Sequence, residues 1–257
     1  MEHMQSSLTN LQPSTDLDCF SLDSKYGYNE NLKRGARIVN QCYKSDEYRK
    51  IRMTYYDAGD NTQVYNSVWY PDPKYNLPVL GIDILAFNRK KYLAIVDFQP
   101  IHEDEANHAV TFEHLLEPIK EKYESLKGRM SSKFYDETQF FSQQMLFARF
   151  DDESIVMKDL FPAFKQYVKL HNDLIKTAPI STDEEQQQVL ERQTAYDTYS
   201  AERDPATALF CSMFGKKWGE DFVYDFLFSR SERNEESLVI PTMPGAPPPQ
   251  HNNRSPN

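Results

Sequence analysis

The sequence predicts an α/β fold: a three-layer α/β/α sandwich with a central antiparallel sheet flanked by helices. Two observations predict it. Residues 50–98 contain four short runs of β-branched and aromatic residues separated by turn formers, whereas from residue 104 onward the hydrophobic period changes to that of a helix. A chain of 257 residues is long enough for one sizeable core of this kind.

The four runs are expected to form an antiparallel meander. They are KIRMTYYDAG (50–59), TQVYNSVWY (62–70), PVLGIDILAF (78–87) and KYLAIVDF (91–98). The segments between them, GDN, PDPKYN and NRK, are rich in residues that favour turns. MLFARF (145–150) lies between two helical patterns and is expected to be a fifth strand.

Five later segments are expected to be helical. HAVTFEHLLEPIKEKYESL and VMKDLFPAFKQYVKLHNDLI have an apolar stripe at helical spacing, and EEQQQVLERQTAYDTYSAE is mostly polar. DPATALFCSMF opens with an N-cap residue and a proline in the first turn, and KKWGEDFVYDFLF supplies apolar residues for the core. The sheet is therefore expected to be covered by helices.

The pattern predicts one domain over residues 31–228. Residues 1–30 are polar and lack periodicity, so we expect a loose N-terminal segment. Residues 229–257 are rich in proline and asparagine and are expected to form a disordered tail without core residues.

Charge and hydropathy exclude several classes of partner. A formal net charge of -10 argues against binding to nucleic acid, which needs clustered lysine and arginine. No apolar run is long enough to span a membrane, and the N-terminus lacks the pattern of a secretory signal. We expect a monomer in the cytoplasm.

Motifs for a bound cofactor are also missing. The eight glycines form neither a dinucleotide-binding motif nor a triphosphate-binding motif, and the three cysteines are too scattered for an iron–sulfur cluster. His102, His108 and His114 lack the spacing of a helical zinc pair, so no metal site is expected. If the protein is a redox enzyme, an external electron donor supplies its electrons.

Asp83 is the most unusual residue of the predicted sheet, because it stands in the apolar run LGIDILAF. Alternation places it on one strand face with Gly81 and Leu85. Burial would raise its pKa and keep a proton available at neutral pH, and the gap above Gly81 would admit a flat ligand. Alternatively, Asp83 pairs with a nearby Arg or Lys, or the strand lies at a sheet edge.

Three separated stretches resemble the ferredoxin-dependent bilin reductases. They are DAGDNTQVYNSVWYPDPKYNLPVLGIDILAF, LAIVDFQP and YSAERDPATALFCSMFGKKWGEDFVYDFLF, and the resemblance runs from about residue 51 to 228. It implies an α/β/α sandwich that holds biliverdin IXα between the sheet and the C-terminal helices. It also implies that no redox cofactor is bound, and that reduced ferredoxin supplies single electrons through bilin radicals.

The motifs are most similar to those of the members that reduce the 15,16 methine bridge. The resemblance therefore implies two-electron reduction of biliverdin IXα to 15,16-dihydrobiliverdin, in phycoerythrobilin biosynthesis, with a downstream reductase as a further partner. One alternative is a phycoerythrobilin-forming reductase, either four-electron or acting on dihydrobiliverdin. The other is a non-catalytic bilin carrier.

The resemblance also implies roles for four residues. Asp83 would be the central proton donor, and Asp204 would be a second acid near the other end of the bilin, although an N-cap alone would explain it. Asn66 stands where phycocyanobilin-forming relatives have histidine and would bind substrate without titrating. Arg149 would bind a propionate or form a surface ion pair. Asp97 receives no role, because its strand face depends on a hairpin register that the sequence leaves open.

Docking of acidic ferredoxin onto a chain of net charge -10 requires a local basic surface. Basic residues gather in a predicted hairpin turn and before the last helix, but they would equally keep these segments soluble. None is assigned as a contact; the candidates are Arg89, Lys90, Lys91, Lys216 and Lys217.

Overall fold

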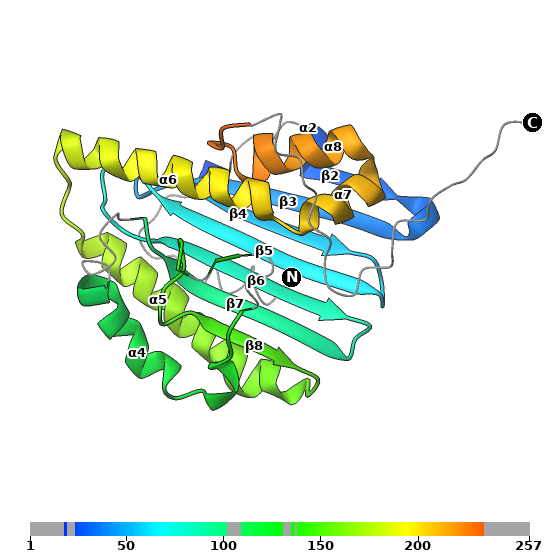
Figure 1. Cartoon of the computed structure of the whole chain (residues 1–257), viewed down its shortest axis with the longest axis horizontal. Helices are drawn as coiled ribbons and strands as arrows, with labels where there is room; N and C mark the ends of the chain where they lie inside the picture. Colours follow the sequence, from blue (N-terminus) through cyan, green and yellow to red (C-terminus); the bar gives the residue numbers. More distant parts are fainter. Residues whose placement is uncertain (1–17, 20–23, 102–108, 131–134, 137, 234–257) are drawn as a thin grey trace, which may run out of the picture.

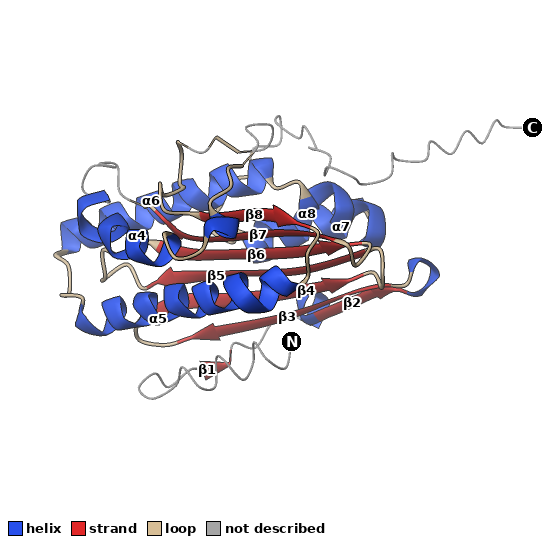
Figure 2. Ribbon diagram, turned by 90° about the horizontal axis from the view of Figure 1, so that it is seen from below, coloured by secondary structure: helices blue, strands red, loops and turns tan. Residues whose placement is uncertain are grey.

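An antiparallel sheet runs through the middle of the molecule, with helices on both of its faces (Figure 1, Figure 2). The computed structural model describes residues 18–19, 24–101, 109–130, 135–136 and 138–233. The predicted three-layer α/β/α sandwich is confirmed in this part of the chain.

The sheet has eight strands among the described residues, in the order β1-β3-β4-β5-β6-β7-β8, and β2 also pairs with β3. The five predicted strands correspond to β4 through β8, each paired with its neighbour in the chain. The strands are β1 (Asp18–Cys19), β2 (Tyr28–Asn31), β3 (Ala36–Lys44), β4 (Tyr48–Asp57), β5 (Thr62–Pro71), β6 (Val79–Phe87), β7 (Lys91–Gln99) and β8 (Leu146–Phe150).

Each of the five predicted helical segments contains a helix, although a turn at residues 121–123 interrupts the first. Pro162 stands in the first turn of α5, where a missing N–H removes no helical hydrogen bond. The helices are α2 (Ser24–Gly27), α4 (His114–Lys120), α5 (Phe161–Thr177), α6 (Asp183–Arg203), α7 (Ala206–Phe214) and α8 (Lys216–Asp221). Short turns are 3₁₀ in η1 (Leu32–Arg34) and η3 (Glu124–Leu126), and π-helical in η2 (Ala109–Glu113), η4 (Val156–Leu160) and η5 (Phe222–Leu227).

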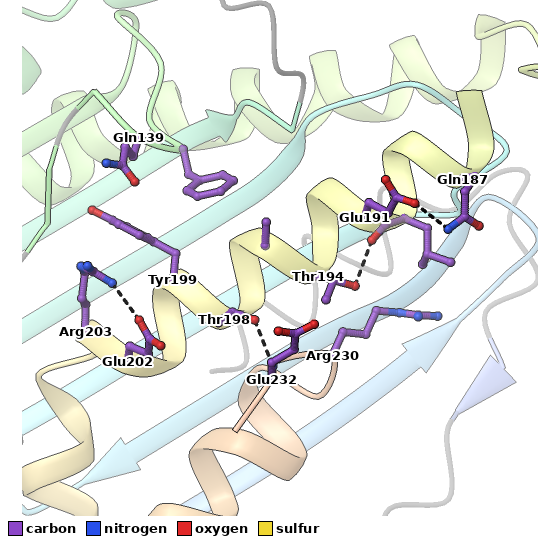
Figure 3. Close-up of a pocket in the computed structure, with 13 residues that line it drawn as sticks. Gln139, Gln187, Glu191, Thr194, Thr198, Tyr199, Glu202, Arg203, Arg230 and Glu232 are labelled. Carbon is purple, nitrogen blue, oxygen red and sulfur yellow. Dashed lines mark hydrogen bonds and ion pairs between the residues drawn. The ribbon is translucent and has the colours of Figure 1, made fainter. Parts of the chain in front are cut away.

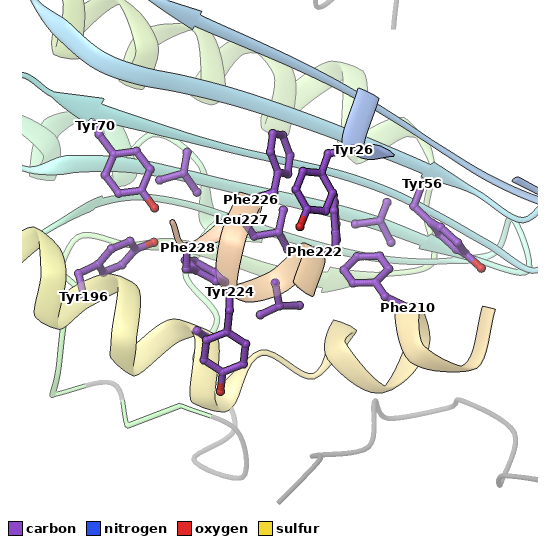
Figure 4. Packing of buried hydrophobic residues seen from close by; sticks show 14 of the residues in the cluster. Tyr26, Tyr56, Tyr70, Tyr196, Phe210, Phe222, Tyr224, Phe226, Leu227 and Phe228 are labelled. Carbon is purple, nitrogen blue, oxygen red and sulfur yellow. The ribbon is translucent and has the colours of Figure 1, made fainter. Parts of the chain in front are cut away.

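The sheet separates two hydrophobic cores. One core lies between the sheet and α4 with α5, and it includes Leu80 and Ile82 of β6. The other lies between the sheet and α6, α7 and η5, and it includes Val79 and Leu85 of β6 (Figure 4). The predicted alternation of side chains along this strand is therefore confirmed, and Asp83 lies on the face that α6 and α7 cover.

The described residues at both ends extend the fold beyond residues 31–228. Tyr26, inside the segment predicted to be loose, is 5% exposed and donates a hydrogen bond to Asp225 over 3.0 Å. In the predicted tail, the Arg230 N–H donates to Asp197 over 3.0 Å, and Lys50 Nζ donates to Ser229 Oγ over 3.0 Å. The predicted loose segment and the predicted tail are therefore wrong where they adjoin the domain, at residues 24–30 and 229–233. Residues 1–17, 20–23 and 234–257 lie outside the described residues.

Candidate active site

Asp83 is positioned by the pairing of β5 with β6. Asn66 lies directly opposite it, and the Asn66 side-chain amide donates a hydrogen bond to Asp83 Oδ1 over 3.2 Å. β6 lies between β5 and β7, so the alternative of an edge strand is wrong. No Lys or Arg of the described residues forms an ion pair with Asp83, so the alternative of a salt bridge is wrong there as well.

The environment of Asp83 keeps it partly protonated near neutral pH. Its pKa rises from an ordinary 3.8 to about 7, chiefly because burial disfavours the charged form. The Asn66 hydrogen bond and the charge of Arg52 oppose this rise, and the charge of Asp204 adds to it. The side chain is only half-buried, so a ligand on this face of the sheet can reach it. Such a carboxyl group can act as a general acid.

Asp204 lies at the junction of α6 and α7, close enough for its charge to act on Asp83. Its Oδ1 accepts a hydrogen bond from the Ala206 N–H over 2.8 Å, so the predicted capping role is confirmed. Burial raises the pKa of Asp204, while the Ala206 hydrogen bond and the charge of Arg52 lower it. The structure thus brings the two predicted acids to one site, and contact of Asp204 with a bilin stays a prediction.

Tyr135 is a site residue that the sequence did not indicate. Burial raises its pKa, and the charges of Asp204 and Asp83 raise it further. Its ring packs against Phe141 and Tyr199, with centroid distances of 5.6 and 6.3 Å. No local pattern could have found it, because it reaches the site from an irregular segment that is distant in sequence.

Partly buried apolar side chains pack on the same face of the sheet as Asp83. Phe87 and Leu93 of the sheet and Leu209 and Met213 of α7 pack at the margin of the core without being fully buried. Side chains of this kind favour contact with a large apolar ligand. They lie between the sheet and the C-terminal helices, where the sequence predicted the pigment.

Arg149 lies on the same face of the sheet as Asp83. It is opposite Leu93, which in turn is opposite Leu85, two residues beyond Asp83 in β6. The guanidinium is exposed and lies over the Phe147 ring at 5.6 Å. Among the described residues it has no ion-pair partner, so the alternative of a surface ion pair is wrong there. A free guanidinium at this margin suits a carboxylate ligand.

The register of the β6–β7 hairpin answers the question left open for Asp97. Asp97 pairs with Gly81 and therefore shares the Asp83 face, but it is fully buried. Its carboxylate accepts hydrogen bonds from the Ser142 N–H, over 2.9 Å, and from the Ser142 hydroxyl. Burial raises the pKa of Asp97 to about 7, and these hydrogen bonds oppose the rise. These hydrogen bonds from Ser142 to Asp97 hold the loop that contains Ser142 against the sheet.

The predicted gap above Gly81 is wrong. A Cβ built on Gly81 would meet Gln99 Oε1 at 2.5 Å, so the Gln99 side chain already fills the space. Tyr196 of α6 donates a hydrogen bond to the same Gln99 oxygen. Gly81 therefore makes room for a neighbouring side chain of the protein and not for a ligand, and the candidate ligand surface lies farther along the strand, towards Phe87.

The candidate docking residues are largely neutralised by acidic neighbours. Arg89 pairs with Asp60 at 2.7 Å, Lys217 pairs with Asp221 at 2.8 Å, and Lys216 lies 3.7 Å from Glu220. These ion pairs agree with the alternative, in which the basic residues keep these segments soluble. No ferredoxin contact is assigned to them.

A groove of about 760 Å³ runs along α6, between Phe140 and the chain at 230–232 (Figure 3). Its walls include Tyr199, Arg203 and Glu191. None of the four predicted site residues lines it, although its wall residue Tyr199 packs against Tyr135.

Neither a metal site nor a membrane span is found in the described part of the chain. No group of three or more His, Cys, Asp or Glu side chains gathers there as a metal site. His102 and His108 lie outside the described residues. No helix among the described residues is both long and apolar enough to cross a membrane.

Curated relatives cover most of the chain. It is 41% identical over 234 residues to "15,16-dihydrobiliverdin:ferredoxin oxidoreductase" of Gloeobacter violaceus, which covers 89% of this chain and 93% of the relative. A protein of the same description from Nostoc punctiforme is 43% identical over 194 residues, covering 75% of this chain and 79% of the relative.

A solved structure and a family profile agree with these relatives. Tomato phytochromobilin synthase in complex with biliverdin superposes with a TM-score of 0.79 at 21% identity, covering 89% of this chain and 82% of that one, which shows the shared fold. The profile of the family "Ferredoxin-dependent bilin reductase" matches residues 4–229. The chain therefore belongs to the ferredoxin-dependent bilin reductases.

Proposed function

We propose that this enzyme uses two electrons from reduced ferredoxin to reduce biliverdin IXα at the 15,16 methine bridge, giving 15,16-dihydrobiliverdin for phycoerythrobilin biosynthesis. The observation that carries the proposal is the half-buried Asp83, whose pKa is about 7, on the sheet face beneath α6 and α7. The relatives of that description, at 41% and 43% identity, support the choice of bond.

The reaction adds two electrons and two protons across the double bond between C15 and C16. In the proposed sequence, ferredoxin delivers one electron to the bound bilin, and Asp83 donates a proton to the radical anion that forms. A second electron and a second proton, the latter from solvent or a recharged Asp83, complete the bond. The Asn66 amide, which cannot titrate, holds Asp83 Oδ1 in place during these steps.

Two further residues have proposed roles in binding. Arg149 is unpaired among the described residues and would receive a propionate of the bilin as a charge-assisted hydrogen bond. Asp204 would contact the opposite end of the pigment while it still caps α7 through Ala206. The proposal places the enzyme in the cytoplasm as a monomer that passes its product to a phycoerythrobilin-forming reductase.

A second candidate is four-electron reduction to phycoerythrobilin. The observation that favours it is that Asp204, a second acid with a raised pKa, lies close to Asp83, because a second reduction would need another proton donor. The two candidates differ in their products.

An anaerobic assay with biliverdin IXα and reduced ferredoxin, followed by absorbance spectra and chromatography, distinguishes them. A single 15,16-dihydrobiliverdin product supports the proposal, and the reaction without ferredoxin is the control. Phycoerythrobilin as the end product would establish the four-electron reaction instead. Bound but unchanged biliverdin would identify a carrier and refute both.

A further inference from the structure

Arg52 of β4 is a fully buried cation that has no counter-ion in contact among the described residues. Its side chain is 0% exposed and lies over the Phe228 ring at 5.9 Å. Its one hydrogen bond among the described residues runs from Nη1 to Thr54 Oγ1 over 3.1 Å. Nε and Nη2 are buried without partners, and no carboxylate of these residues lies within ion-pair distance.

This arrangement is unfavourable for stability alone. Taking a guanidinium out of water costs several kcal/mol, and contacts with carboxylates normally offset that cost. Here a single neutral hydroxyl contacts the group. An apolar side chain of similar volume would fill the position with less desolvation, so the charge of Arg52 points to a role in the site.

The sheet register places Arg52 beside the two acids. Thr54, which accepts its hydrogen bond, pairs with Asn66, and Asn66 pairs with Asp83 and donates to it. Arg52 itself pairs with Val68 and, through it, lies in line with Gly81 on the same face as Asp83. A row of polar side chains, Thr54 and Asn66, therefore leads across β4, β5 and β6 from Arg52 to Asp83.

The positive charge of Arg52 acts on both Asp83 and Asp204. It lowers the pKa of Asp83 and of Asp204, against the larger effect of burial. The effect reaches this far because a buried charge is weakly screened. Arg49, three residues earlier in β4, has no such effect on either acid. It lies 3.9 Å from Asp197, in a separate cluster.

We propose that Arg52 is a positioning residue, the fixed counter-charge that stabilises the Asp83 carboxylate left when Asp83 gives its proton to the bilin radical anion. The proton moves from Asp83 to the pigment, which becomes a neutral radical, and the charge of Arg52 is unchanged throughout. The catalytic part rests on the proposed function. The electrostatic part concerns the ligand-free protein and does not depend on it.

The direct test is a titration of Asp83 in ligand-free protein carrying ¹³C-labelled aspartate carboxyl groups, with the signal assigned by its loss in Asp83→Asn. In Arg52→Met the midpoint should rise by about one pH unit, as expected when a nearby opposite charge is removed. Arg52→Lys keeps the charge and should stay near the wild-type midpoint. Arg49→Met, which removes a partly buried arginine from the same strand, is the matched control and should leave the midpoint unchanged.

Turnover gives a second measurement. Activity needs protonated Asp83 and falls as pH rises through its pKa, so in Arg52→Met this alkaline limb should move to higher pH while maximal turnover falls about three- to tenfold. A purely structural role would lower activity without moving the limb. If Arg52→Met does not fold, Arg52→Gln, which keeps a donor for Thr54, carries the same expectations.

An unchanged Asp83 midpoint in folded, uncharged Arg52 variants would overturn the inference, whatever the activity. Failure of the proposed function looks different: Asp83→Asn would retain full turnover, while the midpoint in Arg52→Met would still rise. The two results are therefore distinguishable.

Discussion

The raised pKa of Asp83 predicts that this residue lowers the stability of the ligand-free protein at alkaline pH. The pKa is about 7 in the folded chain and 3.8 for an ordinary aspartate, a difference of about three pH units. At 1.36 kcal/mol per unit, full ionisation would cost about 4 kcal/mol. Partial exposure of the side chain gives water access to the charge, so we expect about 2 kcal/mol.

The direction of the effect follows from proton binding. Between pH 4 and 7, roughly, the folded state holds a proton on Asp83 that the unfolded state has released, so the free energy of unfolding decreases as pH rises. Asp83→Asn removes this dependence and leaves a neutral side chain beside Asn66. The variant should therefore be more stable than wild type by about 2 kcal/mol at pH 8 and nearly equal to it at pH 4.

Urea unfolding of both proteins at several pH values measures this difference. Asp97, whose pKa is also about 7, is present in both proteins, so its contribution cancels. Asp151→Asn, the same substitution at an exposed position, is the control for the chemical change itself. A stability difference between wild type and Asp83→Asn that stays constant from pH 4 to 8 would refute the reasoning, because Asp83 would then titrate as an ordinary aspartate.

Two further predictions concern substrate binding and the tail. Arg149→Gln should raise the KM for biliverdin about fivefold with little change in kcat, since an exposed ion pair contributes about 1 kcal/mol. Lys176→Gln, on the opposite face of the sheet, is the control. An unchanged KM in Arg149→Gln would count against a propionate contact. Truncation after Arg233 should preserve turnover and Tm, whereas truncation before Ser229 should destabilise the fold by about 2 kcal/mol, because Asp197 loses a buried donor. Equal Tm values for the two truncations would contradict this.

The order of strands and helices could be predicted from the sequence because local patterns determine it. The runs around Val79 and Tyr92 are β-branched and aromatic, and turn residues separate them. β3 was missed because Asn40 interrupts its apolar alternation, although Asn40 faces inward and donates a hydrogen bond to the Tyr26 carbonyl over 2.6 Å. A polar side chain that lies inside a core leaves no apolar signal in the sequence.

The candidate site was only partly predictable, because it depends on contacts between distant segments. The face of Asp83 followed from alternation, but its nearness to Asp204 required the docking of α6 and α7 on the sheet. The space above Gly81 was misjudged because the register that brings Gln99 beside it was unknown. That register comes from the turn of Asn88 and Arg89, both at positive φ, of 52° and 51°.

Arg52 could have been found by the reasoning that singled out Asp83. It stands at an inward-facing position of the run KIRMTYY, so a charged side chain is expected in the core there. What the sequence could not supply is the absence of a contacting carboxylate among the described residues, which distinguishes Arg52 from a buried ion pair.

The central claim is that Asp83 donates a proton to the bilin radical anion. The most direct test mixes Asp83→Asn anaerobically with biliverdin and reduced ferredoxin and follows the pigment by electron paramagnetic resonance and absorbance. The proposal predicts that biliverdin still binds, one electron arrives and a radical accumulates without 15,16-dihydrobiliverdin. Product formation at the wild-type rate, with no accumulated radical, would contradict it.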